Sequence, residues 1–214
     1  MASPIDQFLT TGIACLGCGA ISTTSSLSSA AGFCQATTGN SFFQPDYRIL
    51  ECAACGLLFR CPTLSDEQLS AYYSSLEPIH WEYPSLNPPE KFISRKIAAL
   101  PAGARILDFG CSSGRLLAPW VSLHQCLGFE INAEAAGKAA GRGLTMLTER
   151  QLWSGESGQF NMVVLVDVFE HLRHPTELLT RLWALIAPGG CLVVSTGNGD
   201  HWACRLDPAQ FWYF

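Results

Sequence analysis

The second half of the chain alternates between two hydrophobic patterns, and this alternation most limits the folds that it can adopt. Short apolar runs typical of buried strands are RILDF, QCLGFE, LTML, NMVVLVDV and CLVVST. Between them, helices are expected near residues 114–122, over 132–143 with Asn132 as the cap, and over 175–187. Strands and helices in alternation imply parallel strands joined by crossover helices. The sequence therefore predicts an α/β fold with a doubly wound sheet.

The first hundred residues follow a different pattern. Residues 1–63 hold two tight cysteine pairs around ISTTSSLSSAAG, a Ser/Thr-rich stretch that predicts a flexible loop. Residues 64–100 are predicted to be helical, with a break near EYPSLNPPE because its three prolines prevent the helix from continuing. We therefore expect a small cysteine-containing domain over 1–63, a helical linker or cap over 64–100, and the α/β core over 101–214.

Composition and charge exclude several classes of protein. The 214 residues are 48% hydrophobic and 14% charged, which is typical of a globular chain. The net charge of −5 provides no basic footprint, so a nucleic-acid partner is not expected. No apolar run reaches the roughly 18 residues that cross a bilayer, and the N-terminus lacks the pattern of a signal peptide. We therefore expect a cytoplasmic protein with no membrane partner; the sequence does not predict its oligomeric state.

A glycine turn follows the first predicted strand, in the segment ILDFGCSSG. It lacks the lysine of a nucleoside-triphosphate loop, and Ser112 stands where a dinucleotide fingerprint has its middle glycine. Asp108 ends the strand just before the turn. A carboxylate there would repel a pyrophosphate but attract a ligand that carries an ammonium group. A zwitterionic amino acid fits, because its carboxylate can meet N–H groups of the turn.

A second acid extends this interpretation. Glu130 ends the next predicted strand, about twenty residues further on, where a carboxylate can accept both hydroxyl groups of a ribose. An amino acid joined to a nucleoside is S-adenosylmethionine. Asp108 and the missing middle glycine at Ser112 disfavour a nicotinamide enzyme, the remaining alternative.

Four segments, in this order, resemble the class I S-adenosylmethionine-dependent methyltransferases: ILDFGCSSG, GFEIN, FNMVVLVDVFEHLRHP and LIAPGGCLVVSTGN. They are spread over roughly residues 104–200, about half of the chain. The resemblance implies the Rossmann-like sheet of that family, S-adenosylmethionine as cofactor, and methyl transfer to a small-molecule acceptor.

The resemblance also implies which residues surround the cofactor. It places Asp108, Gly110, Cys111 and Gly114 at the methionine end, Glu130 at the ribose, Ile131 beside the adenine, and Asp167 and Val168 near the sulfonium. His171 follows the fourth strand and is the candidate general base, although a histidine there can equally serve only to hydrogen-bond its loop.

The two cysteine pairs, in CLGCG and CAACG, are each C-x-x-C followed by glycine. Such a glycine lets the backbone turn its N–H groups towards the sulfurs, and two such knuckles offer four thiolates to a tetrahedral metal. We therefore predict structural zinc on Cys15, Cys18, Cys52 and Cys55, although 33 residues separate Cys18 from Cys52, more than in the compact pattern. A thiol redox pair or unligated cysteines are the alternatives, but redox work needs a pair at a strand-to-helix turn, and neither pair lies in such a fold.

The layout of the cysteine region resembles the zinc-binding domain at the front of some bacterial methyltransferases that act on sugar nucleotides and other secondary metabolites. With four thiolates the predicted zinc-ribbon-like site has no open position, so the metal would be structural. The family core normally continues with further strands, and few residues follow VVST, so we expect the C-terminal strands to be missing.

Other functions stay open at this point. A non-catalytic protein could keep the fold and use the zinc module to bind a partner, although Asp108 and Glu130 argue against that. Nucleic-acid methylation is disfavoured by the acidic balance and by the lack of a Lys/Arg cluster near either knuckle. The leading hypothesis is methyl transfer from S-adenosylmethionine to a sugar nucleotide or other secondary metabolite.

Overall fold

The structure is a computed structural model that describes residues 13–21, 23–29, 32–35, 41–44, 47–75, 85–155, 158–199 and 201. The chain forms two compact units. The first contains residues 1–69, 170–178 and 197–214, and the second contains residues 70–169 and 179–196. Each unit is therefore assembled from segments that are distant in the sequence.

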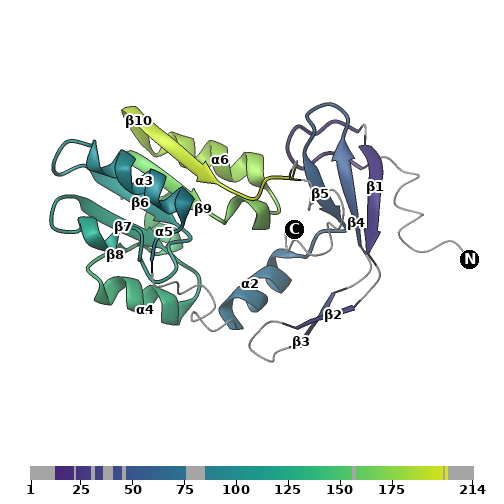
Figure 1. The fold of residues 1–214 in the computed structure, drawn as a ribbon, viewed down its shortest axis with the longest axis horizontal. Helices are drawn as coiled ribbons and strands as arrows, with labels where there is room; N and C mark the ends of the chain where they lie inside the picture. Colours follow the sequence, from purple (N-terminus) through teal and green to yellow (C-terminus); the bar gives the residue numbers. More distant parts are fainter. Residues whose placement is uncertain are drawn as a thin grey trace, which may run out of the picture. The chain divides into compact units, whose positions relative to one another are not determined.

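The second unit is built on a five-stranded sheet (Figure 1). Its strands are β6 (Arg105–Phe109), β7 (Gln125–Phe129), β8 (Thr145–Met146), β9 (Phe160–Val166) and β10 (Ile186–Ser195). The strand order is β10-β9-β6-β7-β8, and every neighbouring pair is parallel. The order reverses direction at β6, as in a doubly wound sheet, so the carboxyl ends of β6, β7 and β9 meet at the topological switch point. The predicted α/β fold is confirmed.

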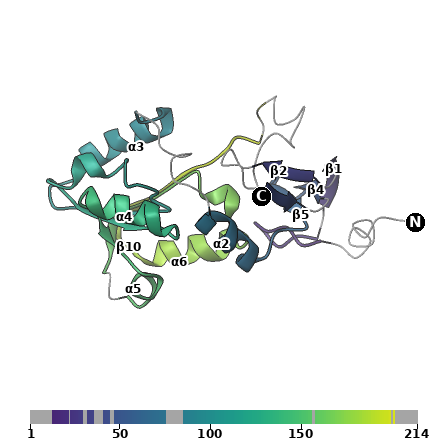
Figure 2. The same ribbon diagram turned by 90° about the horizontal axis from the view of Figure 1, so that it is seen from below.

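Helices cover both faces of this sheet (Figure 2). Helices α3 (Pro88–Ala98) and α4 (Ala133–Gly141) contribute Ile97 and Ala139 to a buried cluster with Ile106 of β6. On the opposite face, Phe109 of β6 contacts Trp153 of α5 (Glu149–Trp153). Asn132 caps α4 by accepting a hydrogen bond from Ala135 N–H, as the sequence predicts. The core thus fixes where β6 ends.

Three local predictions were wrong or incomplete. The helix expected near 114–122 is a set of turns followed by the single 3₁₀ turn η2 (Ala118–Trp120), because Pro119 cannot donate the hydrogen bond of a continuing helix. The helix expected over 175–187 is α6 (Pro175–Ala184), and Ile186 already pairs with Phe160 in the sheet. Helix α5, with its Thr148–Gln151 capping box, was not expected.

The first unit holds a three-stranded antiparallel sheet in the order β1-β4-β5. Its strands are β1 (Thr23–Ser29), β4 (Tyr47–Cys52) and β5 (Leu58–Cys61), and a separate antiparallel pair joins β2 (Gly32–Gln35) to β3 (Ser41–Gln44). The flexible loop expected over the Ser/Thr-rich stretch is therefore a strand over residues 23–29. Its polar residues satisfy their backbone groups by pairing with β4.

The region predicted as a helical linker contains α2 (Asp66–Ser75) and α3, which begins at Pro88, whereas residues 76–84 between them lie outside the described residues. The expectation of missing C-terminal strands concerns residues 202–214, which lie outside the described residues. In the part of the chain that the structure describes, no helix is both long and apolar enough to cross a membrane.

Candidate functional site

The turn after β6 is shaped by two glycines in left-handed conformation. Gly110 has φ +79° and Gly114 has φ +77°, values that L side chains rarely adopt. A Cβ atom on Gly110 would lie 2.5 Å from Cγ2 of Val168, and one on Gly114 would lie 3.0 Å from Cβ of Ala139 on α4. Both glycines are therefore required by close packing as well as by backbone conformation.

Glu130 ties the end of β7 to this turn. Its carboxylate accepts hydrogen bonds from the Ser112 N–H (2.9 Å) and from the Asn132 N–H (2.8 Å). Each carboxylate oxygen keeps a further lone pair, so the group can still accept hydroxyl hydrogens. The structure thus brings the glycine turn and Glu130 together, as the sequence suggested.

Most N–H groups of the turn already have partners inside the protein. Those of Gly110 and Cys111 donate to the Phe129 carbonyl oxygen, and that of Gly114 donates to the Cys111 carbonyl oxygen. With Ser112 N–H bound to Glu130, four donors are committed. A ligand carboxylate would therefore find fewer free donors here than the sequence suggested.

Asp108 is the most perturbed acid of the site. Its side chain is 4% exposed, and burial, reinforced by the carboxylates of Glu90 and Glu130, raises its pKa to about 7. Removal of a carboxylate from water disfavours its charged form, and neighbouring negative charges act in the same direction. A ligand cation beside Asp108 would act against both effects by favouring the ionised form, so the site is suited to a positively charged group.

Two residues that support the turn were not found from the sequence. Glu90, at the start of α3, is 5% exposed and pairs with the Arg115 guanidinium next to the turn. Arg142, at the end of α4, donates through Nη1 to both the carbonyl and the hydroxyl oxygen of Ser113. The N-x-x-E capping pattern from Asn87 to Glu90 could have predicted that Glu90 lies at the start of a helix. No local sequence pattern predicts the contact of Arg142 with the turn.

Ser112 occupies a backbone conformation that favours glycine. Its φ is +47°, and its hydroxyl is buried without a hydrogen-bond partner among the described residues. We expect Ser112→Gly to stabilise the protein by about 1 kcal/mol, because it removes both penalties. The same substitution at Ser113 is expected to destabilise it by a similar amount, since the Arg142 contact to the hydroxyl is lost. Urea unfolding of both variants checks this; a destabilised Ser112→Gly would contradict the explanation.

The remaining predicted cofactor residues differ in their surroundings. Cys111 is buried, with its Sγ 2.7 Å from the position of a Cβ on Gly128, so it packs beneath the turn. Ile131 is 50% exposed. Asp167, with φ +53°, follows β9, and both burial and the Glu90 carboxylate raise its pKa. Val168 packs against Gly110, which places the end of β9 beside the turn.

His171 ends the short 3₁₀ helix η3 (Phe169–His171) and belongs to the first compact unit, whereas the residues above belong to the second. Burial lowers the pKa of His171 to about 4. The imidazole is therefore neutral near pH 7 and able to accept a proton. Its catalytic role stays a prediction.

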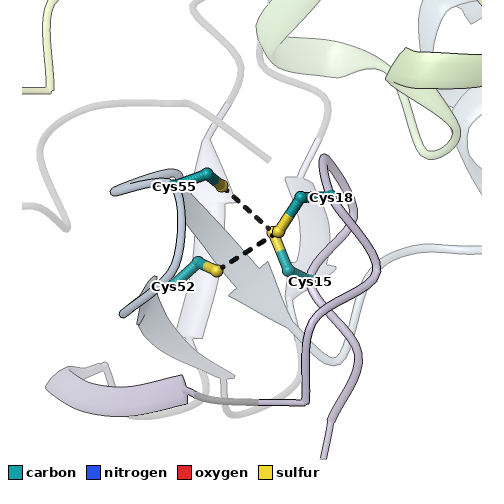
Figure 3. A group of neighbouring side chains, drawn as sticks. All are labelled: Cys15, Cys18, Cys52 and Cys55. Carbon is teal, nitrogen blue, oxygen red and sulfur yellow. Dashed lines mark hydrogen bonds between the residues drawn. The ribbon is translucent and has the colours of Figure 1, made fainter.

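The four cysteines of the two knuckles meet at one point in the first unit (Figure 3). Their sulfur atoms all lie within 4.8 Å of one another, with Cys15–Cys55 at 3.7 Å and Cys18–Cys52 at 3.6 Å. These distances are far longer than the ~2.05 Å of a disulfide. Gly19 and Gly56, which follow the knuckles, have φ +74° and +72°. These left-handed conformations are consistent with the tight backbone turn that the sequence predicts after each cysteine pair.

The sulfur geometry fits a tetrahedral metal. Four thiolates bound at the Zn–S distance of about 2.3 Å lie about 3.8 Å apart at the corners of a tetrahedron. The two sulfur pairs at 3.6 and 3.7 Å agree with this spacing. Gly17 N–H also donates to Cys15 Sγ (3.3 Å), a contact that stabilises a thiolate. The cluster can therefore hold zinc with no coordination position left open.

Comparison with known proteins decides the family. The sequence model of the methyltransferase domain family matches residues 84–214. The chain belongs to this methyltransferase family. The match covers β6 to β10 and every predicted cofactor residue, so the glycine turn and its acids lie within the methyltransferase domain.

Curated relatives share this domain. A ubiquinone biosynthesis O-methyltransferase of Caulobacter sp. strain K31 is 36% identical over 109 residues, which are 45% of this chain and 42% of that protein. The corresponding protein of Xanthomonas axonopodis pv. citri is 29% identical over 132 residues, 57% of this chain and 53% of its own. The chain therefore spans about half the length of the curated relatives that it matches.

A solved structure of magnesium protoporphyrin IX methyltransferase from Synechocystis PCC 6803, with bound S-adenosylmethionine, is also similar to the methyltransferase domain. It is 18% identical, covers 58% of this chain and 74% of its own, and superimposes with a TM-score of 0.48.

Proposed function

We propose that the protein transfers a methyl group from S-adenosylmethionine to a small-molecule acceptor. The observation that carries the proposal is the buried Asp108 at the carboxyl end of β6, within a domain of the methyltransferase family. A carboxylate held there at an energetic cost needs a cationic partner, and the aminoacyl end of S-adenosylmethionine carries an ammonium group.

Different residues of the chain would contact different parts of the cofactor. Asp108 would pair with the ammonium group, and Glu130 would accept the ribose hydroxyls with the lone pairs left free by Ser112 and Asn132. Gly110, Cys111 and Gly114 would line the methionine end, with Ile131 beside the adenine and Asp167 and Val168 near the sulfur. When bound, the cofactor supplies a methyl group activated by a sulfonium.

His171 is proposed as the general base that removes the proton of the attacking group. Its neutral imidazole can accept a proton at neutral pH, although a pKa of about 4 makes it a weak base. This weakness fits an acceptor that loses its proton late, as the bond to the methyl group forms. The four cysteines are proposed to hold structural zinc, which leaves the chemistry to the methyltransferase domain.

The acceptor is proposed to be a sugar nucleotide or another secondary metabolite, as the layout of the cysteine region suggests. The names of the curated relatives favour oxygen as the methylated atom. A search for the acceptor would therefore begin with hydroxylated small molecules.

Calorimetric titration of the zinc-loaded protein with S-adenosylhomocysteine tests the cofactor. We expect micromolar binding, no binding of NAD⁺, and about tenfold weaker binding by Glu130→Gln, since a neutral amide accepts ribose hydroxyls less strongly than a carboxylate. Glu134→Gln, which removes an exposed acid paired with Lys138, is the matched control and is expected to bind like the parent. If the folded, zinc-loaded chain fails to bind S-adenosylhomocysteine, the alternative of a non-catalytic interaction protein is favoured instead.

A further inference from the structure

The compact unit that holds the cysteine cluster also contains two segments of the methyltransferase domain. Residues 170–178 follow β9, and residues from 197 onward follow β10. The first of these segments begins within η3 and carries His171. The metal cluster and the candidate base thus belong to one unit, although about 120 residues separate Cys52 from His171 in the sequence.

One peptide group connects the cluster to this segment. The N–H of Gly17 donates to the Cys15 sulfur (3.3 Å), and its carbonyl oxygen accepts the hydroxyl hydrogen of Thr176 (2.6 Å). Gly17 is closely packed against the knuckles, because a Cβ there would lie 3.0 Å from Leu57 and 3.8 Å from the Cys15 sulfur. A metal that fixes the Cys15 sulfur therefore also fixes the acceptor of the Thr176 hydrogen bond.

Two further contacts join the segments after β9 and β10 to residues 1–69 of the same unit. Arg173 lies 3.9 Å from the Asp66 carboxylate at the start of α2, and it also lowers the pKa of Glu67, after that residue's own backbone and Ser65. Both acids are exposed, so this attraction is weak on its own. Gly199, after β10, approaches Leu58 closely enough that a Cβ would lie 3.0 Å from its Cδ1. Of these contacts, the hydrogen bond from Thr176, which is also exposed, is the one made to the residue whose N–H contacts the Cys15 sulfur.

We propose that the metal-loaded first knuckle holds residues 170–178 in place through Thr176, which makes Thr176 a positioning residue for His171. Structural zinc then acts on catalysis by ordering the segment that carries the base, without touching substrate or cofactor. The catalytic part rests on the proposed function, whereas the ordering of the segment by the metal does not.

Linkage makes the proposal reciprocal. If the metal stabilises the ordered segment, the ordered segment must stabilise the bound metal by the same factor. Removal of the Thr176 hydroxyl should therefore weaken retention of zinc, although Thr176 is not a ligand. A neutral hydrogen bond of ordinary strength corresponds to about a fivefold effect.

Hydrogen–deuterium exchange of the full chain, with zinc and after its removal by a chelator, measures the first direction. Exchange of peptides covering 170–178 is expected to speed up about tenfold on zinc removal. Because zinc removal can also unfold the whole unit, the zinc-loaded Thr176→Val variant is compared. Its amide exchange is expected to be faster than that of the zinc-loaded parent over 170–178 and equal to it over 52–57. Thr176→Ser, which keeps the hydroxyl, is expected to restore protection.

Equilibrium competition for zinc with a colorimetric chelator measures the second direction. Thr176→Val is expected to bind zinc about fivefold less tightly than the parent, whereas Thr176→Ser and Thr145→Val, a matched change on β8, are expected to keep the parent affinity. The proposal is overturned if 170–178 exchanges identically with and without zinc, if Thr176→Ser behaves like Thr176→Val, or if the chain takes up no zinc. Binding of S-adenosylhomocysteine by the same samples tests the proposed function separately, since its site lies in the other unit.

Discussion

Replacing Cys52 with serine is expected to abolish retention of zinc and to unfold the cysteine-containing unit. Cys52 is 1% exposed, and it is both a predicted ligand and part of the unit's small core. The buried members of that core are Cys15, Leu50, Cys52 and Phe59, so half of them are predicted ligands. Structural zinc contributes on the order of 10 kcal/mol to folding in zinc-finger peptides, and a core of this size cannot replace it.

Metal analysis after dialysis, combined with thermal unfolding, measures this effect. The parent should retain one zinc ion per chain, as a single four-thiolate site requires, and Cys52→Ser should retain almost none. Cys61→Ser is the matched control, because Cys61 lies half-buried on β5 outside the cluster and its loss should leave the zinc content unchanged. Full zinc retention by Cys52→Ser, or none by the parent, would refute the metal site.

The features that could be predicted from the sequence are those set by local residues. Each knuckle depends on a C-x-x-C-G stretch whose glycine takes positive φ, and the strands of the sheet each show an apolar run of their own. The Gly110 and Gly114 positions were also local, because the turn itself requires them. Parallel pairing of the strands then followed from the alternation of strands and helices.

The features that were missed depend on partners distant in the sequence. The stretch Thr23–Ser29 has the composition of a loop, but its backbone groups pair with β4, more than twenty residues later. Glu90 and Arg142 reach the glycine turn from α3 and α4 only after the helices pack on the sheet. The support of the candidate site therefore comes from tertiary packing, which no short pattern records.

Asp108→Asn is expected to weaken binding of S-adenosylhomocysteine at least a hundredfold while stabilising the ligand-free protein. Breaking a buried pair costs about 3–5 kcal/mol, which accounts for the loss of affinity. Stability moves in the opposite direction. Because the folded pKa of about 7 lies above the ordinary value of 3.8, the contribution of Asp108 to stability is full below pH 4 and is lost as the pH rises through 7. A neutral amide avoids this loss.

The same pKa predicts how affinity depends on pH. The acid that binds an ammonium group must be ionised, and at pH 5.5 only about 3% of a group with pKa 7 is ionised, against half at pH 7. Affinity of the parent should therefore rise about fifteenfold between these pH values, with release of a proton on binding. At a pH high enough to remove the ligand's own ammonium proton, binding should weaken again.

Other charges near Asp108 shift its pKa and therefore shift the pH at which the affinity rises. Glu90 and Glu130 raise its pKa, whereas Arg115 compensates much of the Glu90 charge by pairing with it. Arg115→Gln should thus shift the rise in affinity to higher pH, because Glu90 is left without its partner. Calorimetry in buffers of different ionisation enthalpy measures the released proton directly. A parent affinity that is flat from pH 5.5 to 7, or an Asp108→Asn variant that keeps the pH dependence, would remove Asp108 from the cofactor site.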